Sequence, residues 1–241
     1  MTTSAFSSTS SNELSSSPPP SSVAFFDLDR TVLDINSANL WVKREWMTGY
    51  LSTWNVLKAA GLLLQYHWGR ADLKQAFLSS IQLLKGQKEQ DFKNRIYDFY
   101  QSEIKHRVRP EVYDALRTHR QRGDLCVLLT SSSVYLAHLI QKQLGFDEIL
   151  CTRFDVKQGI FTGSPQGPTA FGSGKVTLAQ NYVLPKQLRL KDCWMYTDSY
   201  SDLPILEAVG FPQVVCPDRR LYAHAYKVKW PILQWSKSEH S

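Results

Sequence analysis

Short apolar runs that alternate with helical segments constrain the fold of this 241-residue chain more than any other feature. Continuous apolar strands are typical of a parallel sheet that is buried on both faces. Their alternation with helices predicts an α/β fold, in which helices cover both faces of a parallel sheet. The runs are VAFF at 23–26, LCVLL at 125–129, CWMY at 193–196 and QVVC at 213–216, and a further short strand is expected at 148–152.

Helices are predicted between these strands from the spacing of their apolar residues. Each of the first two predicted helices is followed by a glycine, Gly123 or Gly145, and a glycine is a common end of a helix. A hairpin is expected over 153–163, turning at Gln158-Gly159. The predicted helices cover 111–122, 134–144, 175–182 and 203–209.

The segment between the first and second strands differs from the rest, because it shows helical periodicity and no strand pattern. Apolar residues recur there at spacings of three and four, as in Phe77, Ile81 and Leu84. The insertion follows the carboxyl end of a strand, where open α/β sheets place their ligands. We therefore expect a Ser/Pro-rich tail over 1–22, an α/β core over 23–35 and 107–241, and a helical cap over 36–106.

The charge pattern favours a small anionic partner over nucleic acid. The net charge is +6, but Lys and Arg are spread along the chain without a block of five or more. A nucleic-acid groove usually shows clustered basic residues with interleaved aromatics. The four cysteines lie far apart, in or beside apolar runs, which is typical of reduced, buried thiols.

No feature of the sequence predicts export or insertion into a membrane. The first 22 residues contain ten serines, three prolines and no Lys or Arg, unlike a secretory signal. The longest apolar segment, Trp54–Trp68, contains Lys58 and His67 and is shorter than a membrane span. It fits a helix packed on other helices, with an amphipathic surface helix as the alternative. We expect a cytoplasmic protein without a membrane contact, and the pattern assigns no oligomeric state.

Two carboxylates end the first strand, in the stretch FFDLDRT at 25–31. Neighbouring carboxylates raise each other's pKa unless positive charge lies between them. Asp27 and Asp29 therefore belong either to a solvated loop or to a cation-binding pair.

Further polar residues follow other strands or open a helix. Thr130, Asp198 and Asp202 could each cap a helix, and Lys175 could be a surface lysine. Because parallel strands bring their carboxyl ends to one edge, we instead expect these four residues to converge with the two aspartates.

The segments FFDLDRT, LLTSSS, GSGK and YTDSYSDLPIL, in that order, resemble the four motifs of the haloacid dehalogenase-like hydrolases. The helical insertion after the first motif resembles the phosphoserine-phosphatase-like subclass, and the similarity extends from about residue 23 to residue 233. The resemblance implies a Rossmann-like core with a helical cap, Mg²⁺ as cofactor and a small phosphorylated metabolite as substrate. The presence of both aspartates in the first motif favours phosphate-ester hydrolysis over branches that replace the second one.

The resemblance also implies catalytic roles. Asp27 would attack phosphorus, and Asp29 would protonate the leaving oxygen and later take a proton from water. Thr31 would hold Asp29 and the following turn. Thr130 and Lys175 would bind the phosphoryl oxygens.

A metal site is implied by the same resemblance. Mg²⁺ would be held by Asp27, the backbone carbonyl of Asp29 and Asp198, all of them hard oxygen ligands. Asp202 would form hydrogen bonds to metal-bound waters or to Lys175.

Substrate recognition departs from the subclass pattern. Arg30 stands where a small residue is common, and either meets an anionic substrate or is a solvated loop residue. Ser131 is a second candidate for substrate binding. Phosphoserine phosphatases usually have a Glu shortly after the first motif, whereas Asp34 is the only acid in the corresponding stretch here. Phosphoserine is therefore not the expected substrate.

Two other functions remain open from the sequence. A phosphotransferase or mutase would pass the phosphoryl group to an alcohol instead of water, with the same motif residues. A non-catalytic binding protein on this fold is the third possibility, although the retained acids and Lys175 argue against it.

Overall fold

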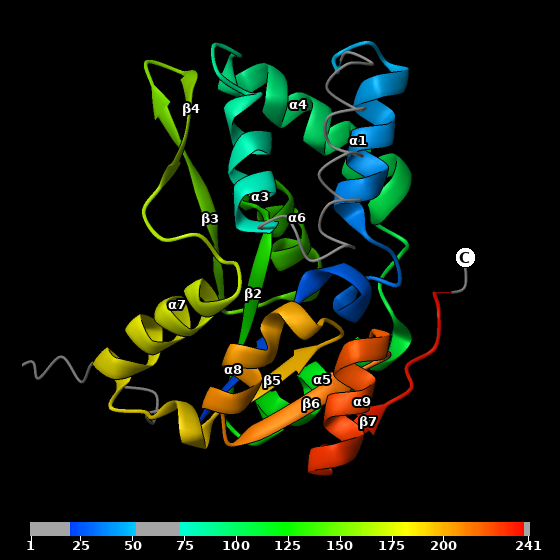
Figure 1. The fold of residues 1–241 in the computed structure, drawn as a ribbon, viewed down its shortest axis with the longest axis vertical. Helices are drawn as coiled ribbons and strands as arrows, with labels where there is room; N and C mark the ends of the chain where they lie inside the picture. The colour runs from blue at the N-terminus through cyan, green and yellow to red at the C-terminus, as the bar shows by residue number, and fades with distance from the viewer. Residues whose placement is uncertain (1–19, 52–72, 239–241) are drawn as a thin grey trace, which may run out of the picture.

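The computed structural model describes residues 20–51 and 73–238, and a seven-stranded sheet forms its centre (Figure 1). The strand order is β4-β3-β2-β1-β5-β6-β7, and every neighbouring pair is parallel except β3 and β4. The predicted α/β fold is confirmed. The strands are β1 Val23–Phe26, β2 Leu125–Ser133, β3 Glu148–Lys157, β4 Ile160–Gln166, β5 Trp194–Thr197, β6 Phe211–Val215 and β7 Ile232–Leu233.

Two predicted segments fall wholly or largely outside the described residues. They are the tail over 1–22, of which residues 20–22 are described, and the helix over 54–68. In the part of the chain that is described, none of the helices has the length and apolar composition needed to cross a bilayer.

Helices cover both faces of the sheet, as its doubly buried strands require. Ala24 and Phe26 of β1 pack on the face that α5 and α6 cover, whereas Val23 and Phe25 pack on the opposite face. All four side chains are fully buried. The first face carries α5 Pro110–Gln121 and α6 Val134–Leu144, and the second carries α7 Ser173–Val183, α8 Leu203–Ala208 and α9 Arg219–Val228.

The strands β2 and β3 extend beyond the apolar runs that predicted them. Ser133 at the end of β2 pairs with Thr152 of β3, after a shift of register. An apolar run marks only the part of a strand that is buried on both faces, so the polar end of β2 was not predicted. The hairpin is confirmed, and its turn residues Gln158 and Gly159 both have positive φ, 51° and 75°.

The sequence analysis did not predict α9 or β7. The carboxylate of Asp218 accepts hydrogen bonds from the N–H groups of Arg220 and Leu221, both at 2.9 Å, and so caps α9. This cap, followed by Leu221 and Ala225 on one helix face, is a signal that could have predicted the helix. β7 has two residues, too few for a periodic pattern.

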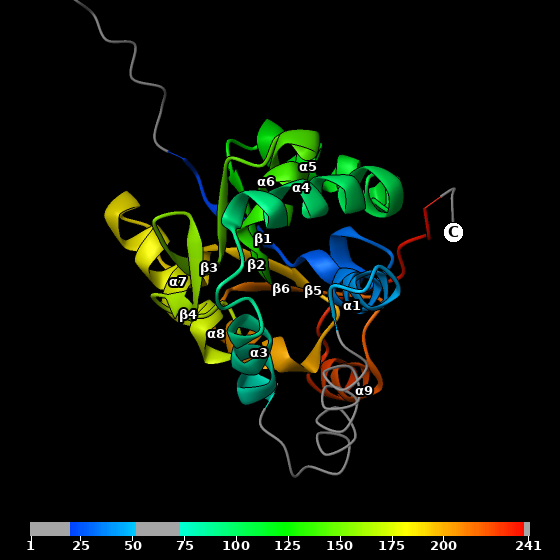
Figure 2. The same cartoon turned by 90° about the horizontal axis from the view of Figure 1, so that it is seen from above.

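Three of the helices between β1 and β2 lie beyond the carboxyl ends of the parallel strands, whereas α5 packs on the sheet (Figures 1 and 2). The β3–β4 hairpin reaches the same level and bonds to the segment between two of them. Gly86 N–H donates to the Phe161 carbonyl, and Phe161 N–H donates to the Gln87 carbonyl, both at 3.0 Å. The division into core and cap stays a prediction. The helices are α1 Ser37–Met47, α3 Leu73–Gln82 and α4 Glu89–Phe99.

The two chain crossings between these helices and the sheet are bonded to each other. Asp34 N–H donates to the Arg107 carbonyl at 2.9 Å, and Arg109 N–H donates to the Val32 carbonyl at 3.0 Å. The Arg109 guanidinium also donates to the Trp235 carbonyl at 3.1 Å. The segment that follows β7 therefore ties the crossings to the sheet.

Three of the four cysteines confirm the prediction of buried, reduced thiols. Cys126, Cys151 and Cys193 are free and buried, while Cys216 is free and half-buried. Burial raises the pKa of Cys126 to about 12 and that of Cys151 and Cys193 to about 11. These thiols are inert at neutral pH.

The imidazole of His119 on α5 is buried and is hydrogen-bonded at both nitrogens. Its Nδ1 lies 2.8 Å from a carboxylate oxygen of Asp124, and its Nε2 lies 3.0 Å from the hydroxyl of Tyr196. With the carboxylate as acceptor, Nδ1–H donates to Asp124 and Nε2 accepts from Tyr196. Burial lowers the pKa of His119, and the contact with Asp124 opposes that change.

We expect this buried imidazole to make the protein less stable in acid. His119 takes up a proton near pH 6.5 when unfolded but only at lower pH when folded, so its contribution is complete above pH 6.5 and declines below it. The decline for one such group is at most about 1.4 kcal/mol per pH unit. His119→Phe should remove this slope while lowering stability at every pH, because Asp124 and Tyr196 lose a partner.

Urea unfolding at pH 5.5 and pH 7.5, followed by tryptophan fluorescence, measures both effects. The difference between the slopes of the two proteins reports the loss of His119 together with its contacts to Asp124 and Tyr196, because the other titrating groups keep their surroundings. Equal slopes would contradict this assignment.

Candidate active site

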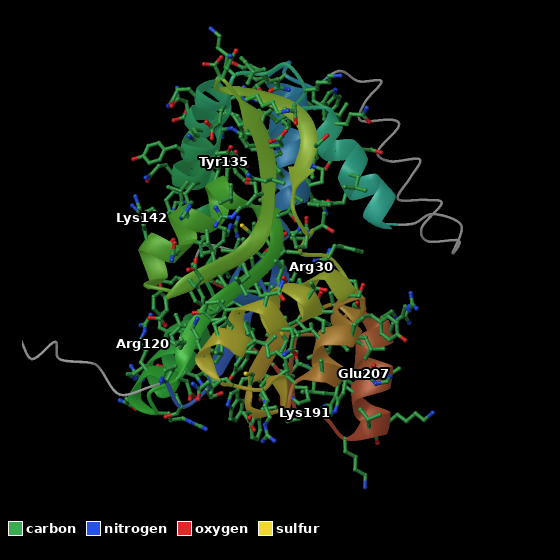
Figure 3. All side chains as sticks on the ribbon, turned by 90° about the vertical axis from the view of Figure 1, so that its left-hand side faces the viewer. Arg30, Arg120, Tyr135, Lys142, Lys191 and Glu207 are labelled. Carbon is green, nitrogen blue, oxygen red and sulfur yellow. The ribbon has the colours of Figure 1, made fainter. Side chains whose placement is uncertain are left out.

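The first pair of carboxylates is presented at the carboxyl end of β1. The chain there makes a single wide turn over Leu28–Val32. Arg30 lies in the left-handed region, with φ of 59°, a conformation that costs a non-glycine residue on the order of 1 kcal/mol. The turn leaves Asp27 buried and Asp29 half-buried. Figure 3 shows Arg30 at the level where the sheet meets the helices beyond its edge.

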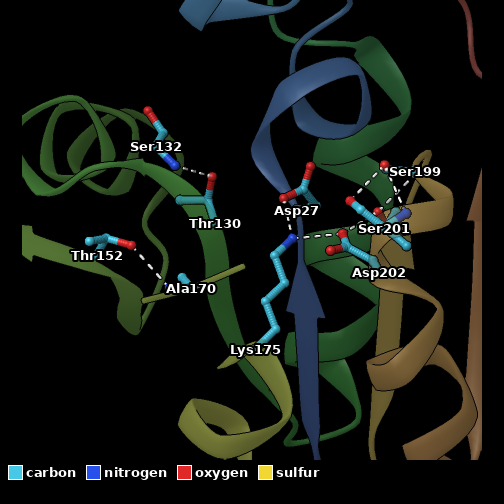
Figure 4. A network of polar contacts seen from close by, with 10 residues as sticks. Asp27, Thr130, Ser132, Thr152, Ala170, Lys175, Ser199, Ser201 and Asp202 are labelled. Carbon is cyan, nitrogen blue, oxygen red and sulfur yellow. Dashed lines mark hydrogen bonds and ion pairs between the residues drawn. The ribbon is translucent and has the colours of Figure 1, made fainter. Parts of the chain in front are cut away.

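The side chain of Lys175 joins β1 to the loop after β5 (Figure 4). Its ammonium nitrogen lies 2.6 Å from Asp27 Oδ1 and 2.6 Å from Asp202 Oδ2. The Thr197 hydroxyl donates to the same oxygen of Asp202 at 2.7 Å. All four side chains are buried. The interpretation of Lys175 as an ordinary surface lysine is therefore wrong.

The start of α7 aims Lys175 at the strand ends. Gly172 precedes the helix with φ of 53°, which glycine adopts without a steric penalty. Gly174 lies so close to the Thr169 carbonyl oxygen that a Cβ at this position would overlap it. The two glycines of the GSGK motif therefore allow the backbone conformation that places the Lys175 ammonium against Asp27, at the end of β1.

The loop after β5 supplies a further buried carboxylate, Asp198. Its backbone carbonyl accepts from Asp218 N–H at 2.8 Å, and the Asp218 side chain accepts from Tyr200 N–H at 2.7 Å. The hydroxyls of Ser199 and Ser201 lie 2.9 Å apart in this loop. Asp218, which sequence reasoning did not single out, therefore holds the loop while it caps α9.

The carboxylate of Asp29 is tied to the helix beyond the sheet edge. Its Oδ1 accepts a hydrogen bond of 2.7 Å from the backbone N–H of Ser37, the first residue of α1. This contact fixes Asp29 relative to α1, and the sequence did not predict it.

The carboxylates lie in surroundings that disfavour negative charge. Burial raises the pKa of Asp27 to about 7; Asp202 and Asp29 add to the rise, and Lys175 opposes it. Burial raises the pKa of Asp198 to about 8, with Asp27 and Asp202 adding to the effect. Burial also raises the pKa of Asp29, although its hydrogen bond from Ser37 opposes the rise. Burial disfavours the charge on Lys175, but Asp202 and Asp27 outweigh it and raise its pKa.

One cavity of about 210 Å³ brings most of the predicted site residues together. Thr31 and Thr130 are not among its lining residues in the described chain. Lining residues that sequence reasoning did not assign are Asn36, Phe171, Ser199 and Ser201. The predicted residues that line it are Asp27, Asp29, Arg30, Ser131, Lys175, Asp198 and Asp202.

The two threonines are buried beside the cavity. The Thr130 hydroxyl oxygen accepts from Ser132 N–H at 3.0 Å (Figure 4), and Ser133, not Thr130, caps the following helix. The Thr31 hydroxyl has no hydrogen-bond partner among the described residues. Ser199 caps the short turn that follows β5, and Asp198 caps none of the described helices. Asp202 occupies the N-cap position of α8, but its side chain makes no capping hydrogen bond and binds Lys175 instead. The capping interpretations of Thr130 and Asp198 are therefore wrong, and that of Asp202 holds for its position but not for its side chain.

Asp34, the only acid in the stretch where the subclass usually has Glu, lies away from the cavity. Its carboxylate accepts from the backbone N–H and the hydroxyl of Ser238, both at 2.9 Å. It does not line the cavity. The expectation that phosphoserine is not the substrate stays a prediction.

The donor set and its charge fit a divalent cation. The Asp198 carboxylate is 5% exposed and has no hydrogen bond or ion pair with another described residue. With all four carboxylates ionised, Lys175 and Arg30 leave two negative charges unbalanced. Carboxylate and carbonyl oxygens are the ligands that Mg²⁺ prefers. The described residues contain no group of three or more His, Cys, Asp or Glu side chains suited to a metal, so a site here also needs a backbone carbonyl.

Comparison with known proteins identifies the family. The model of the haloacid dehalogenase-like hydrolases matches residues 24–207, most of the chain, so the protein belongs to this family of enzymes. The chain is 30% identical over 224 residues to the inhibition of morphological differentiation protein of Streptomyces azureus, covering 90% of this chain and 80% of that protein. It is 28% identical over 223 residues to a Mycobacterium tuberculosis protein named as a probable phosphatase, covering 91% and 77%.

Solved structures share the fold. A Bordetella pertussis Tohama I protein of unknown function has a TM-score of 0.81 and 26% identity, covering 89% of this chain and 99% of that one. A phosphoserine phosphatase with an analogue of its phospho-aspartyl intermediate has a TM-score of 0.66 and 16% identity, covering 91% and 95%. The second likeness shows a common fold. The resemblance found in the four motifs is confirmed.

The close approach at Gly174 gives a test of how Lys175 is positioned. Gly174→Ala must displace the Thr169 carbonyl or the start of α7 and so move Lys175 away from Asp27. We expect kcat/KM for ester hydrolysis to fall at least about tenfold. Gly210→Ala is the matched control. Its Cβ would overlap the Lys191 carbonyl, but this contact lies just before the amino ends of β5 and β6, away from the cavity.

Thermal unfolding and steady-state kinetics on both variants separate the two effects. Both substitutions should lower Tm by several degrees, but Gly210→Ala should keep kcat/KM within about threefold of the wild type. Equal losses of activity in the two variants would show that Gly174 acts only through stability.

Proposed function

We propose that this protein is a Mg²⁺-dependent phosphomonoester hydrolase that acts on small organic phosphates through an aspartyl phosphate on Asp27. The observation that carries the proposal is the buried contact of Asp27 with Lys175, in one cavity with three further carboxylates. Buried like charges destabilise a fold, and groups of this kind cluster at sites that bind a ligand or carry out a reaction. The phosphatase name of one relative supports the same chemistry.

Two aspartates divide the proton and phosphoryl chemistry. Asp27 attacks phosphorus and forms an acyl phosphate, while protonated Asp29 donates its proton to the departing oxygen. Asp29, now ionised, takes a proton from water as the water attacks the acyl phosphate, which restores both residues. The raised pKa of Asp29 favours its protonated form before the first step.

Mg²⁺ would be held by Asp27, the backbone carbonyl of Asp29 and Asp198. When bound, it supplies positive charge that neutralises the carboxylates and the transferring phosphoryl group. The buried carboxylate of Asp198, without another partner among the described residues, supports this assignment.

The remaining polar residues would bind or position the phosphoryl group. Lys175 and Thr130 would hold its oxygens, and Asp202 would keep Lys175 charged and oriented. Arg30 and Ser131 border the cavity and would contact the substrate. Thr31, buried in the turn that carries Asp29, would stabilise it by packing, since its hydroxyl has no hydrogen-bond partner among the described residues.

The helices α1, α3 and α4 would act as a cap. Asp29 bonds to the first residue of α1, so the position of α1 and that of the acid are linked. Excluding bulk water while the acyl phosphate forms would favour transfer from substrate to Asp27.

Asp27→Asn should abolish turnover, by at least about 10³-fold in kcat, because the amide is not a nucleophile for phosphorus. The substitution keeps the shape of the side chain, so folding should persist. Phosphate release should be measured with and without Mg²⁺ on a panel of monoesters, and with an added acceptor alcohol to detect phosphotransfer. Asp114→Asn, at an exposed position, is the control and should be fully active.

Near-normal activity of Asp27→Asn would exclude Asp27 as the nucleophile. No release from any ester by the wild type, or transfer to alcohol in place of release, would exclude hydrolysis as the function.

Asp198→Asn should separate metal binding from stability. We expect the Mg²⁺ concentration for half-maximal activity to rise at least about tenfold, since a charged ligand is lost. Without Mg²⁺ the variant should unfold several degrees above the wild type, because on folding the wild type must protonate Asp198, whose pKa burial raises to about 8, or bury its charge, whereas the amide requires neither. Activity at increasing Mg²⁺ concentrations measures the first effect, and thermal unfolding with and without Mg²⁺ measures the second. Equal Mg²⁺ stabilisation of the two proteins would exclude Asp198 as a ligand.

A further inference from the structure

A second cavity of about 210 Å³ lies between the helices beyond the sheet edge and the end of β2. None of the described side chains that line it is charged. Its walls are mainly apolar, with five aromatic rings and several serine hydroxyls. The rings belong to Trp41, Phe77, Phe92, Phe99 and Phe154.

This apolar cavity adjoins the acidic cavity. Ser131, at the end of β2, lines both of them. Ser37 lines the apolar cavity, and its backbone N–H donates to Asp29 at 2.7 Å. The residue assigned to protonate the leaving oxygen is therefore bonded to the wall of the apolar cavity. A group attached to that oxygen has this cavity beside it.

Resting on the proposed function, we propose that the apolar cavity binds the organic part of the substrate. The preferred substrates are then monoesters of alcohols that carry an aryl group or a short branched alkyl group. The size agrees, because an apolar cavity of roughly 150 Å³ accommodates benzene, and this one leaves room for one or two further carbon atoms.

The same walls disfavour substrates whose organic part is charged. An ammonium or carboxylate group moved from water to an uncharged pocket loses hydration without gaining an ion-pair partner. Asp34, the acid nearest in sequence to the first motif, is bonded to Ser238 and does not line either cavity. The cavity thus selects against amino-acid and amino-alcohol phosphates.

The test compares 2-phenylethyl phosphate with ethanolamine phosphate. Both are esters of primary alcohols with a two-carbon link, so they differ mainly in a phenyl ring against an ammonium group. We expect kcat/KM for 2-phenylethyl phosphate to be higher by roughly 10- to 100-fold, from burial of the ring. An equal or reversed preference would overturn the inference.

Ala38→Trp tests whether the preference arises in this cavity. Ala38 is an exposed residue of α1 that lines the cavity, so a larger side chain there reduces the space with little effect on folding. Its neighbour Asn39 is exposed and does not line the cavity, which makes Asn39→Trp the matched control. Ala38→Leu fills less of the space and serves if the tryptophan variant fails to fold.

Ala38→Trp should lower kcat/KM for 2-phenylethyl phosphate at least about tenfold, and that for ethanolamine phosphate less than about threefold. Asn39→Trp should change neither. An equal loss on both esters, or no loss on either, would overturn the assignment of the cavity. If ethanolamine phosphate is hydrolysed well and the phenyl ester poorly, the inference fails while the proposed function stands. If neither ester nor any other is hydrolysed, both fail.

Discussion

The ammonium group of Lys175, held at 2.6 Å from both Asp27 and Asp202, is the interaction on which the arrangement of the site depends. This ammonium group fixes the relative positions of three elements that the sheet alone does not hold together. They are the end of β1, the loop after β5 and the start of α7. Burying three charges is costly, and an ion pair of this kind contributes little net stability. Its role is to fix geometry, since removing any partner leaves an uncompensated buried charge.

The sequence predicts the composition of the site better than its supporting contacts. Asp27, Lys175, Asp198 and Asp202 could be placed together because parallel strands end at one edge and the motifs follow those strands. The hydrogen bond from Ser37 to Asp29 could not be predicted, because it depends on where α1 lies after a chain reversal. Asp218 acts through backbone groups of a loop distant in sequence, and no local pattern marks that role.

The fold shows the same division between local and non-local information. Strands that are buried on both faces have continuous apolar runs and were predicted, whereas the polar end of β2 was not. The hairpin at Gln158-Gly159 was predicted from its turn, but not the hydrogen bonds that join it to the segment between α3 and α4. Those bonds link Gly86 and Gln87 to Phe161, and only the folded structure brings these segments together.

The position of the two cavities follows from these non-local contacts. The acidic cavity is built from strand ends, whose polar residues are fixed by the sheet, whereas the apolar cavity is built mainly from helices that the hairpin and the Ser37–Asp29 contact hold in place. Substitutions in the helices can therefore alter the apolar walls without moving Asp27 or Lys175. If the proposed function holds, chemistry and selectivity are separated in this architecture, because the groups assigned to the phosphoryl group lie at the strand ends and at the start of α7, whereas most groups assigned to the leaving alcohol belong to the insertion.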